Sequence, residues 1–264
     1  MQGRLSQKKN SPLQSFPSKT WSEEFSRARE IGFNKIEWLI DNSNTKDNPL
    51  FSEDGRQKII ELSKNNKIKI NTLCFHYFIY GEILKSNLHS SKIRNFFFKT
   101  IELAPLIGIK YLSIPLMDKM SLKNKIIFEE MSEFLKEVSH DLKIEILIES
   151  DLEKYELLNF IENIDSPKIG ILYDTGNATK NNFVFEEDFS LLSKYIKEIH
   201  IKDFSLRSHQ SVRLGHGNTN FINIFKIIKD QKWKGPLVLE TPIFDNWQAE
   251  AKLNLNYIFK ILKN

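Results

Sequence analysis

Four ionisable side chains each end a short apolar run of the sequence. They are Glu149 in "ILIE", Asp174 in "ILYD", His200 in "EIHI" and Glu240 in "LVLE". A buried carboxylate without a partner is costly, so it pairs, takes up a proton or binds a metal. Three acids brought together would repel one another, and a cation relieves that repulsion. For any one of them a salt bridge or a capped strand end is the alternative, but together they predict a divalent metal site.

Three further side chains could reach the same site, although each could instead have a purely structural role. His76 follows "LCF", where a buried histidine often only satisfies a core hydrogen bond. Glu37, within "IEWLI", could line the site, support it from behind or pair with a lysine at the surface. Lys202 could neutralise one of the three acids, which leaves the case for a metal intact.

These side chains need elements that bring several strand ends together. Runs rich in Ile, Leu and Val, typical of strands covered on both faces, occur at residues 1–5, 35–40, 67–75, 110–116, 143–150, 168–175, 196–203 and 235–242. Helix-like segments follow them at 20–32, 52–66, 90–108, 121–142, 151–164, 185–195, 221–231 and 245–263. Thr20 and Glu23 match a capping box at the start of the first.

Eight strand and helix pairs predict an α/β fold, a (β/α)₈ TIM barrel that forms a single domain over residues 1–264. In such a barrel functional groups gather at the C-terminal ends of the strands, where all four ionisable residues are expected. A doubly wound open sheet is the alternative. That fold more often carries a glycine-rich turn after its first strand, which this sequence lacks.

The composition is that of an ordinary globular protein, with 41% hydrophobic and 27% charged residues. No run of about 18 apolar residues could span a bilayer, and "MQGRLSQKKN" has no apolar signal region. The single cysteine excludes an internal disulfide framework and fits a reducing cytoplasm. The net charge of +4 is dispersed along the chain. We expect a cytoplasmic protein without a membrane or nucleic-acid partner, either monomeric or a homodimer.

Short motifs occur in a fixed order along the chain: "MQGRLS", "QSFPSKTW", "IEWLID", "IES", "YDTGN", "HIKD", "VRLGHGNTNF" and "LVLET". In this order they resemble the sugar phosphate isomerase/epimerase family of xylose isomerase-like TIM barrels, which also includes endonuclease IV. The resemblance implies a divalent ion (Mn, Co, Mg or Zn) held by Glu149, Asp174, His200 and Glu240. It also implies that Glu149 and Glu240 act as acid and base.

The chemistry of that family begins at a carbon beside a carbonyl. A metal stabilises the enediolate formed when the proton leaves, and one carboxylate removes that proton as general base. A second carboxylate on the opposite face can return a proton with inverted configuration, which is epimerisation. Return to the adjacent carbon gives aldose–ketose isomerisation. The expected function is therefore a metal-dependent isomerase or epimerase of a sugar or sugar phosphate.

Two positions depart from the family pattern. Asn177 stands where many members have histidine, and an amide can bind a substrate hydroxyl but not a metal as imidazole does. His216 stands where an acidic residue is common. Arg213 matches a family arginine that meets substrate oxygens, although a solvated surface arginine is the alternative. The expected substrate-binding set is Arg213, His76, Asn177, Glu37, Lys202 and His216. Backbone N–H groups in "GHGN" (215–218) could also hold a phosphate.

Three other functions are kept as alternatives. An abasic-site nuclease like endonuclease IV needs three zinc ions, and only His76 and His200 are expected near strand ends. A barrel that binds a sugar-like ligand without turnover would have no need of both Glu149 and Glu240. A keto-polyol dehydratase starts with the same proton abstraction and then expels a hydroxyl group.

Overall fold

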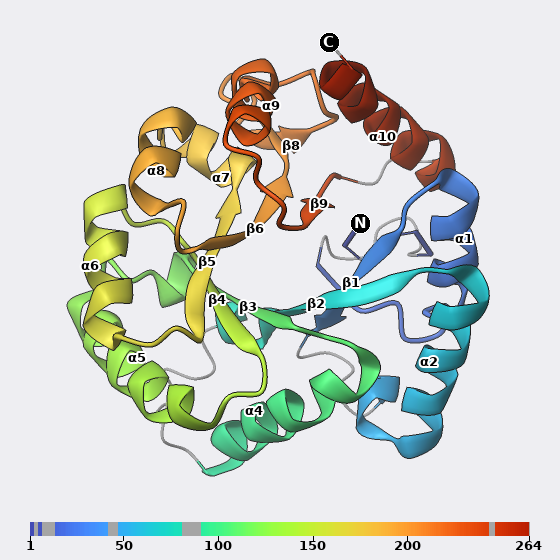
Figure 1. Ribbon diagram of the computed structural model, residues 1–264, viewed down its shortest axis with the longest axis horizontal. Helices are drawn as coiled ribbons and strands as arrows, with labels where there is room; N and C mark the ends of the chain where they lie inside the picture. The colour runs from blue at the N-terminus through green and yellow to red at the C-terminus, as the bar shows by residue number, and fades with distance from the viewer. Residues whose placement is uncertain (3–4, 7–13, 42–46, 81–90, 243–245, 264) are drawn as a thin grey trace.

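The computed structural model of this chain describes residues 1–2, 5–6, 14–41, 47–80, 91–242 and 246–263. Its centre is a parallel sheet with the strand order β1-β2-β3-β4-β5-β6-β9. The strands are β1 (Lys35–Ile40), β2 (Lys69–Phe75), β3 (Tyr111–Leu116), β4 (Glu145–Ser150), β5 (Ile169–Asp174), β6 (Ile196–Ile201) and β9 (Leu237–Leu239). Figure 1 shows the strands arranged around a central axis, with the helices outside them.

The first residues of the chain join the two ends of this sheet. The Gln2 N–H donates to the carbonyl of Leu239 on β9 over 3.2 Å, and the Glu37 N–H on β1 donates to the carbonyl of Met1 over 2.9 Å. Gln2 thereby pairs in parallel with Glu37. The predicted TIM barrel is confirmed as a nearly closed barrel of seven strands. Of the strand expected at 1–5, residues 3 and 4 lie outside the described residues, and the rest contributes this one bridge.

Helices cover the outside of the barrel (Figure 1). They are α1 (Glu23–Ile31), α2 (Glu53–Asn66), α4 (Ser91–Leu103), α5 (Lys125–Val138), α6 (Lys154–Ile164), α8 (Phe185–Leu192), α9 (Phe221–Asp230) and α10 (Trp247–Lys263). Each expected helix is present, with bounds that differ by a few residues. Within the described ranges, no helix is both long and apolar enough to cross a membrane.

The predicted capping box at Thr20 and Glu23 is wrong. Helix α1 begins after Ser22, whose side chain makes no capping hydrogen bond. The Thr20 hydroxyl donates instead to the carbonyl of Ser6 over 3.0 Å, and Glu23 forms an ion pair with Arg27 one turn along the helix. Both side chains of the motif therefore bond to partners other than the backbone N–H groups that a capping box would satisfy.

Short elements that the sequence pattern did not predict stand at the C-terminal ends of two strands. Helix α7 (Thr175–Lys180) directly follows β5, and Asp174 caps it by accepting the Asn177 N–H. Strands β7 (Asp203–Ser205) and β8 (Gln210–Val212) form an antiparallel hairpin after β6. Each is too short to show an apolar period, and together they form part of the rim on which the polar residues lie.

The inner face of the barrel is more polar than is usual. Side chains alternate along a strand, so Glu198 and His200 share one face of β6, and they are 0% and 1% exposed. The inner layers of TIM barrels are mostly branched aliphatic residues. Here Thr72 of β2 and Ser113 of β3 are also buried. Polar groups therefore continue from the mouth down into the barrel.

Candidate functional site

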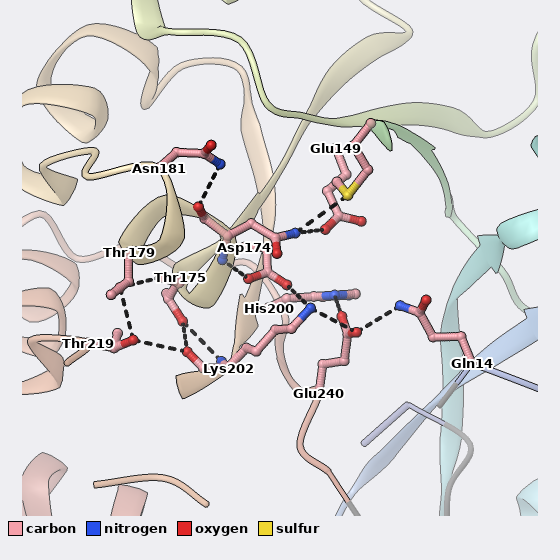
Figure 2. A network of polar contacts seen from close by, with 12 residues as sticks. Gln14, Glu149, Asp174, Thr175, Thr179, Asn181, His200, Lys202, Thr219 and Glu240 are labelled. Atoms are coloured by element: carbon pink, nitrogen blue, oxygen red, sulfur yellow. Dashed lines mark hydrogen bonds and ion pairs between the residues drawn. The ribbon is translucent and has the colours of Figure 1, made fainter. Parts of the chain in front are cut away.

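The residues predicted as metal ligands lie at the C-terminal ends of strands. Glu149 is on β4, Asp174 ends β5, His200 is on β6 and Glu240 directly follows β9. All four are buried, with at most 5% of the residue exposed. Parallel register sets Asp174 beside His200, and Figure 2 shows the four side chains converging on one space.

Three of the four are close enough to share one ion. Ligand atoms of Asp174, His200 and Glu240, one from each, lie within 4.8 Å of one another. Nδ1 of His200 is 2.8 Å from Oε2 of Glu240. Glu149 stands outside this triad and is held separately, since its Oε1 accepts from the Asn177 side-chain amide over 2.7 Å. The predicted set is therefore a triad with a carboxylate beside it.

Asn177 connects this outer carboxylate to the triad. Its backbone N–H donates to Oδ1 of Asp174 over 2.7 Å, while its side-chain amide holds Glu149. The amide also lies 3.8 Å from the sulfur of Met117. Because Asn177 is in the first turn of α7, the start of that helix sets the distance between the two carboxylates.

Lys202 lies between two members of the triad. Its Nζ is 3.4 Å from Oδ2 of Asp174 and 3.3 Å from Oε1 of Glu240. The Lys202 backbone is fixed as well, because Thr175 Oγ1 accepts its N–H over 3.0 Å and donates to its carbonyl over 2.8 Å (Figure 2). Gly176 provides room for the side chain, since a Cβ there would lie 2.6 Å from Lys202 Cγ.

Glu240 has an amide neighbour, Gln14, that the strand pattern of the sequence did not indicate. The side-chain amide of Gln14 donates to Oε1 of Glu240 over 2.7 Å. Gln14 opens the motif "QSFPSKTW", which marked the family resemblance but gave this residue no role. Glu149 and Glu240 are thus each oriented by an amide that cannot itself take up a proton.

Burial and mutual repulsion dominate the electrostatics of the site. Burial, reinforced by Asp174 and Glu240, raises the pKa of Glu149 to about 8. Burial also raises the pKa of Asp174, and Lys202 opposes that rise. Carboxylates that repel one another in this way are stabilised by a cation between them.

The donor set fits a divalent cation. Two carboxylates and an imidazole within 4.8 Å, with the carboxylate of Glu149 beside them, are the oxygen and nitrogen ligands that suit Mn²⁺, Co²⁺, Mg²⁺ or Zn²⁺. Only one ammonium, that of Lys202, is hydrogen-bonded to this group among the described residues. A cation would therefore meet three carboxyl groups that share a single ammonium.

Comparison with known proteins assigns the chain to a family. The family model of the xylose isomerase-like TIM barrel matches residues 25–261. The chain belongs to the xylose isomerase-like TIM barrels. A provisionally named L-ribulose-5-phosphate 3-epimerase of Haemophilus influenzae is 25% identical over 242 residues, which cover 84% of this chain and 83% of that protein.

Two further comparisons complete this picture. A provisionally named endonuclease 4 of Mycoplasma mobile is 35% identical over 117 residues, 38% of this chain and 42% of that protein. The structure of an L-ribulose 3-epimerase is similar at a TM-score of 0.76 and 17% identity, covering 95% of this chain and 92% of that one. The xylose isomerase-like resemblance stated from the motifs is thus confirmed, and this family contains both kinds of relative.

In this xylose isomerase-like barrel, Arg213 and His216 follow strand β8. The Arg213 guanidinium makes a bidentate ion pair with Glu250 of α10, and His216 is exposed. Neither is among the described residues that line the cavity next to Glu149. Arg213 and Glu250 are far apart in the sequence, so reading the loop alone could not reveal this pairing.

The loop 215–218 does not offer the expected phosphate cradle. Asp203 accepts the backbone N–H groups of Gly215 and Gly217 over 2.9 and 2.8 Å, and that of Thr219 over 3.1 Å. The N–H groups of His216 and Asn218 donate to backbone carbonyls. The amides that would bind an anion are therefore engaged within the protein, and their carboxylate partner would repel one.

The remaining predicted residues take different places. His76 is buried directly after β2, at the same end of the barrel as the triad. Glu37, expected beside substrate, lies deeper, with its Oε1 3.3 Å from Nε2 of His200. Glu198 was missed, and its Oε1 is 3.1 Å from the same nitrogen. Its position two residues before His200 in a strand was the signal that could have found it.

Proposed function

We propose that this protein is a divalent-metal-dependent epimerase or isomerase of a sugar or sugar phosphate. The observation that carries the proposal is a pair of buried carboxylates at a cation-binding donor set: Glu240 within the triad and Glu149 beside it. They come from β4 and β9, which two other strands separate in the sheet. The names of the epimerase relatives support the same class of reaction.

The pair is suited to move protons at a carbon next to a carbonyl. A carboxylate with a pKa near the working pH is an effective general base, and the pKa of Glu149 is raised to about 8. One carboxylate takes the proton, and the electron pair left on carbon moves into the carbonyl to form an enediolate. The other carboxyl group returns a proton to the opposite face of the planar carbon.

The neighbouring groups hold this pair in place. Asn177 binds one oxygen of Glu149, which leaves the other oxygen free of that amide to exchange a proton. Gln14 and Lys202 both bind Oε1 of Glu240. Asp174, His200 and the two glutamates would hold a divalent cation, which would supply electrostatic stabilisation of the negative oxygens of the enediolate.

The test is solvent deuterium incorporation together with metal analysis. Purified protein, as prepared and after addition of Mn²⁺, is incubated in D₂O with L-ribulose and with L-ribulose 5-phosphate, the sugars in the names of the relatives. We expect deuterium at the carbon next to the carbonyl, and a loss of about 10²-fold or more in Glu149→Gln and Glu240→Gln. Glu145→Gln, at the opposite end of β4, is the matched control.

Each outcome separates this function from its alternatives. Undiminished exchange in both glutamine variants contradicts the two-carboxylate mechanism. A net loss of water from a keto-polyol, with deuterium uptake, favours the dehydratase. Three zinc equivalents per chain and cleavage of abasic DNA favour the nuclease. Absence of bound metal even with added Mn²⁺ would mean that the four residues form a network of salt bridges and not a metal site.

A further inference from the structure

A pair of carboxyl groups lies beneath the triad, on the side of His200 that faces the barrel interior. Glu37 of β1 and Glu198 of β6 are 1% and 0% exposed. Their Oε1 atoms are 3.3 and 3.1 Å from Nε2 of His200. Among the residues that the structure describes, their Oε2 atoms have no hydrogen-bond partner.

The two ring nitrogens of His200 therefore face different surroundings. Nδ1 faces the mouth, 2.8 Å from Oε2 of Glu240, whereas Nε2 faces the buried pair. An ionised carboxylate accepts hydrogen bonds and cannot donate one. A neutral imidazole that keeps its proton on Nε2 can donate to Glu198 or Glu37, and its Nδ1 lone pair then points to the mouth.

We infer that Glu37 and Glu198 are positioning residues that hold the proton of His200 on Nε2 and present Nδ1 to the cation. This inference rests on the proposed function, since it needs a cation at the triad. A carboxylate behind a ligating histidine fixes the tautomer and the orientation of the ring, and its loss commonly weakens metal binding about 10- to 100-fold.

Two carboxyl groups face this one N–H. One oxygen of each lies within 4.8 Å of the other and of His200, and both side chains are fully buried. An imidazole N–H between two such oxygens has an acceptor on either side, and this restricts the orientation of the ring.

The experiment measures metal affinity and the protonated ring nitrogen on the full-length protein. Titration calorimetry with Mn²⁺ is run on the wild type, Glu198→Met, Glu198→Gln and Ser113→Ala. Methionine removes the acceptor at similar volume, whereas glutamine keeps a carbonyl acceptor. Ser113→Ala is the matched control, because it removes a buried hydroxyl that bonds to the Leu73 carbonyl. Two-bond ¹H–¹⁵N spectra of the Zn²⁺-loaded, histidine-labelled protein report the tautomer, with His200→Ala for assignment.

We expect the proton on Nε2 in the wild type and about 10- to 100-fold weaker binding in Glu198→Met. Glu198→Gln should restore much of the affinity, and Ser113→Ala should match the wild type. A proton on Nδ1 in the wild type overturns the inference without any variant. Equal affinity in Glu198→Met also overturns it and leaves the proposed function standing, whereas a wild type that binds no metal overturns both. A second bound ion that Glu198→Met removes makes the pair ligands, which contradicts a positioning role.

Discussion

Nζ of Lys202 lies 3.3 Å from Oε1 of Glu240. The same ammonium is 3.4 Å from Asp174, so one buried lysine stands beside two of the residues that we propose to bind a cation. Its side chain is only 11% exposed. Lys202 therefore supplies part of the positive charge that these carboxylates need, and any bound cation supplies the rest.

Replacing Lys202 by methionine should make the stability of the protein depend on metal. Removing one partner of a buried ion pair costs about 3–5 kcal/mol, because the other charge is left unpaired. We expect a loss of that order in the free energy of unfolding when EDTA is present. Added Mn²⁺ should restore more stability in Lys202→Met than in the wild type, as measured by urea unfolding.

The control for this variant is Lys58→Met. Lys58 pairs with Glu61 on the surface of α2 over 2.9 Å, and an exposed pair of this kind contributes less than about 1 kcal/mol. Its loss should be small and the same with or without metal. If Mn²⁺ stabilises Lys202→Met no more than the wild type, the ammonium and the cation do not share the same carboxylates.

Gly176→Ala should be destabilising although it lies in a helix. Alanine normally gains about 0.5–1 kcal/mol over glycine there. A Cβ at position 176 would lie 2.6 Å from Cγ of Lys202 and 3.0 Å from its Cβ and Cδ. These atoms belong to the stem of the side chain, so the clash should cost about 1–3 kcal/mol, measured by urea unfolding.

A double-mutant cycle tests that cause. In Lys202→Ala the Cγ is absent, and Gly176→Ala should cost less there than in the wild type. Lys180→Ala, an exposed position of the same helix, controls for helix propensity. Equal costs of Gly176→Ala in both backgrounds would mean that Lys202 is not what the new methyl group meets.

The metal-free protein should lose stability as pH rises from about 5 to 8. Burial raises the pKa of Glu149 and of Glu198 to about 8, so the native state keeps protons that the unfolded chain has already released. The free energy of unfolding therefore falls as pH rises, by up to about 1.4 kcal/mol per pH unit for each group. His200 acts in the same direction, because the carboxylates around it raise its pKa despite its burial.

Urea unfolding in EDTA at pH 5.5, 7 and 8.5 measures this slope. The α-amino group of Met1, whose pKa burial lowers to about 6, opposes the trend as a single group. Glu149→Gln should flatten the slope, since it removes one of the groups that titrate. With Mn²⁺ the loss at high pH should shrink, because a cation favours the ionised carboxylates. Stability that rises with pH in EDTA would contradict these assignments.

The parts of the site that the sequence predicted share one physical origin. Glu149, Asp174 and His200 follow or lie in apolar runs, and such runs form parallel strands whose C-terminal ends meet. The barrel was predictable for the same reason, because the sequence alternates eight times between a strand-like apolar run and a helix-like segment. Only the first strand differed, and it contributes a single bridge at Gln2 to the described structure.

The parts that could not be predicted depend on partners distant in the sequence. Arg213 has the chemistry of a substrate clamp, but Glu250 from the last helix engages it. Gln14 binds Glu240, which lies 226 residues away in the sequence. Asp203 ends the motif "HIKD", and nothing in that motif indicated that its carboxylate would accept the backbone N–H groups of the following loop.

Asp203→Asn should loosen that loop without disturbing the barrel. The carboxylate accepts three backbone N–H groups, from Gly215, Gly217 and Thr219. An asparagine replaces one acceptor oxygen with a donor that faces N–H groups, and hydrogen bonds to a charged group contribute about 1.5–3 kcal/mol. We expect a loss of about 2 kcal/mol and faster amide hydrogen exchange at these three residues. Asp230→Asn, at the exposed end of α9, should leave both unchanged. Protection of the three amides that survives Asp203→Asn would mean that contacts other than this carboxylate hold the loop.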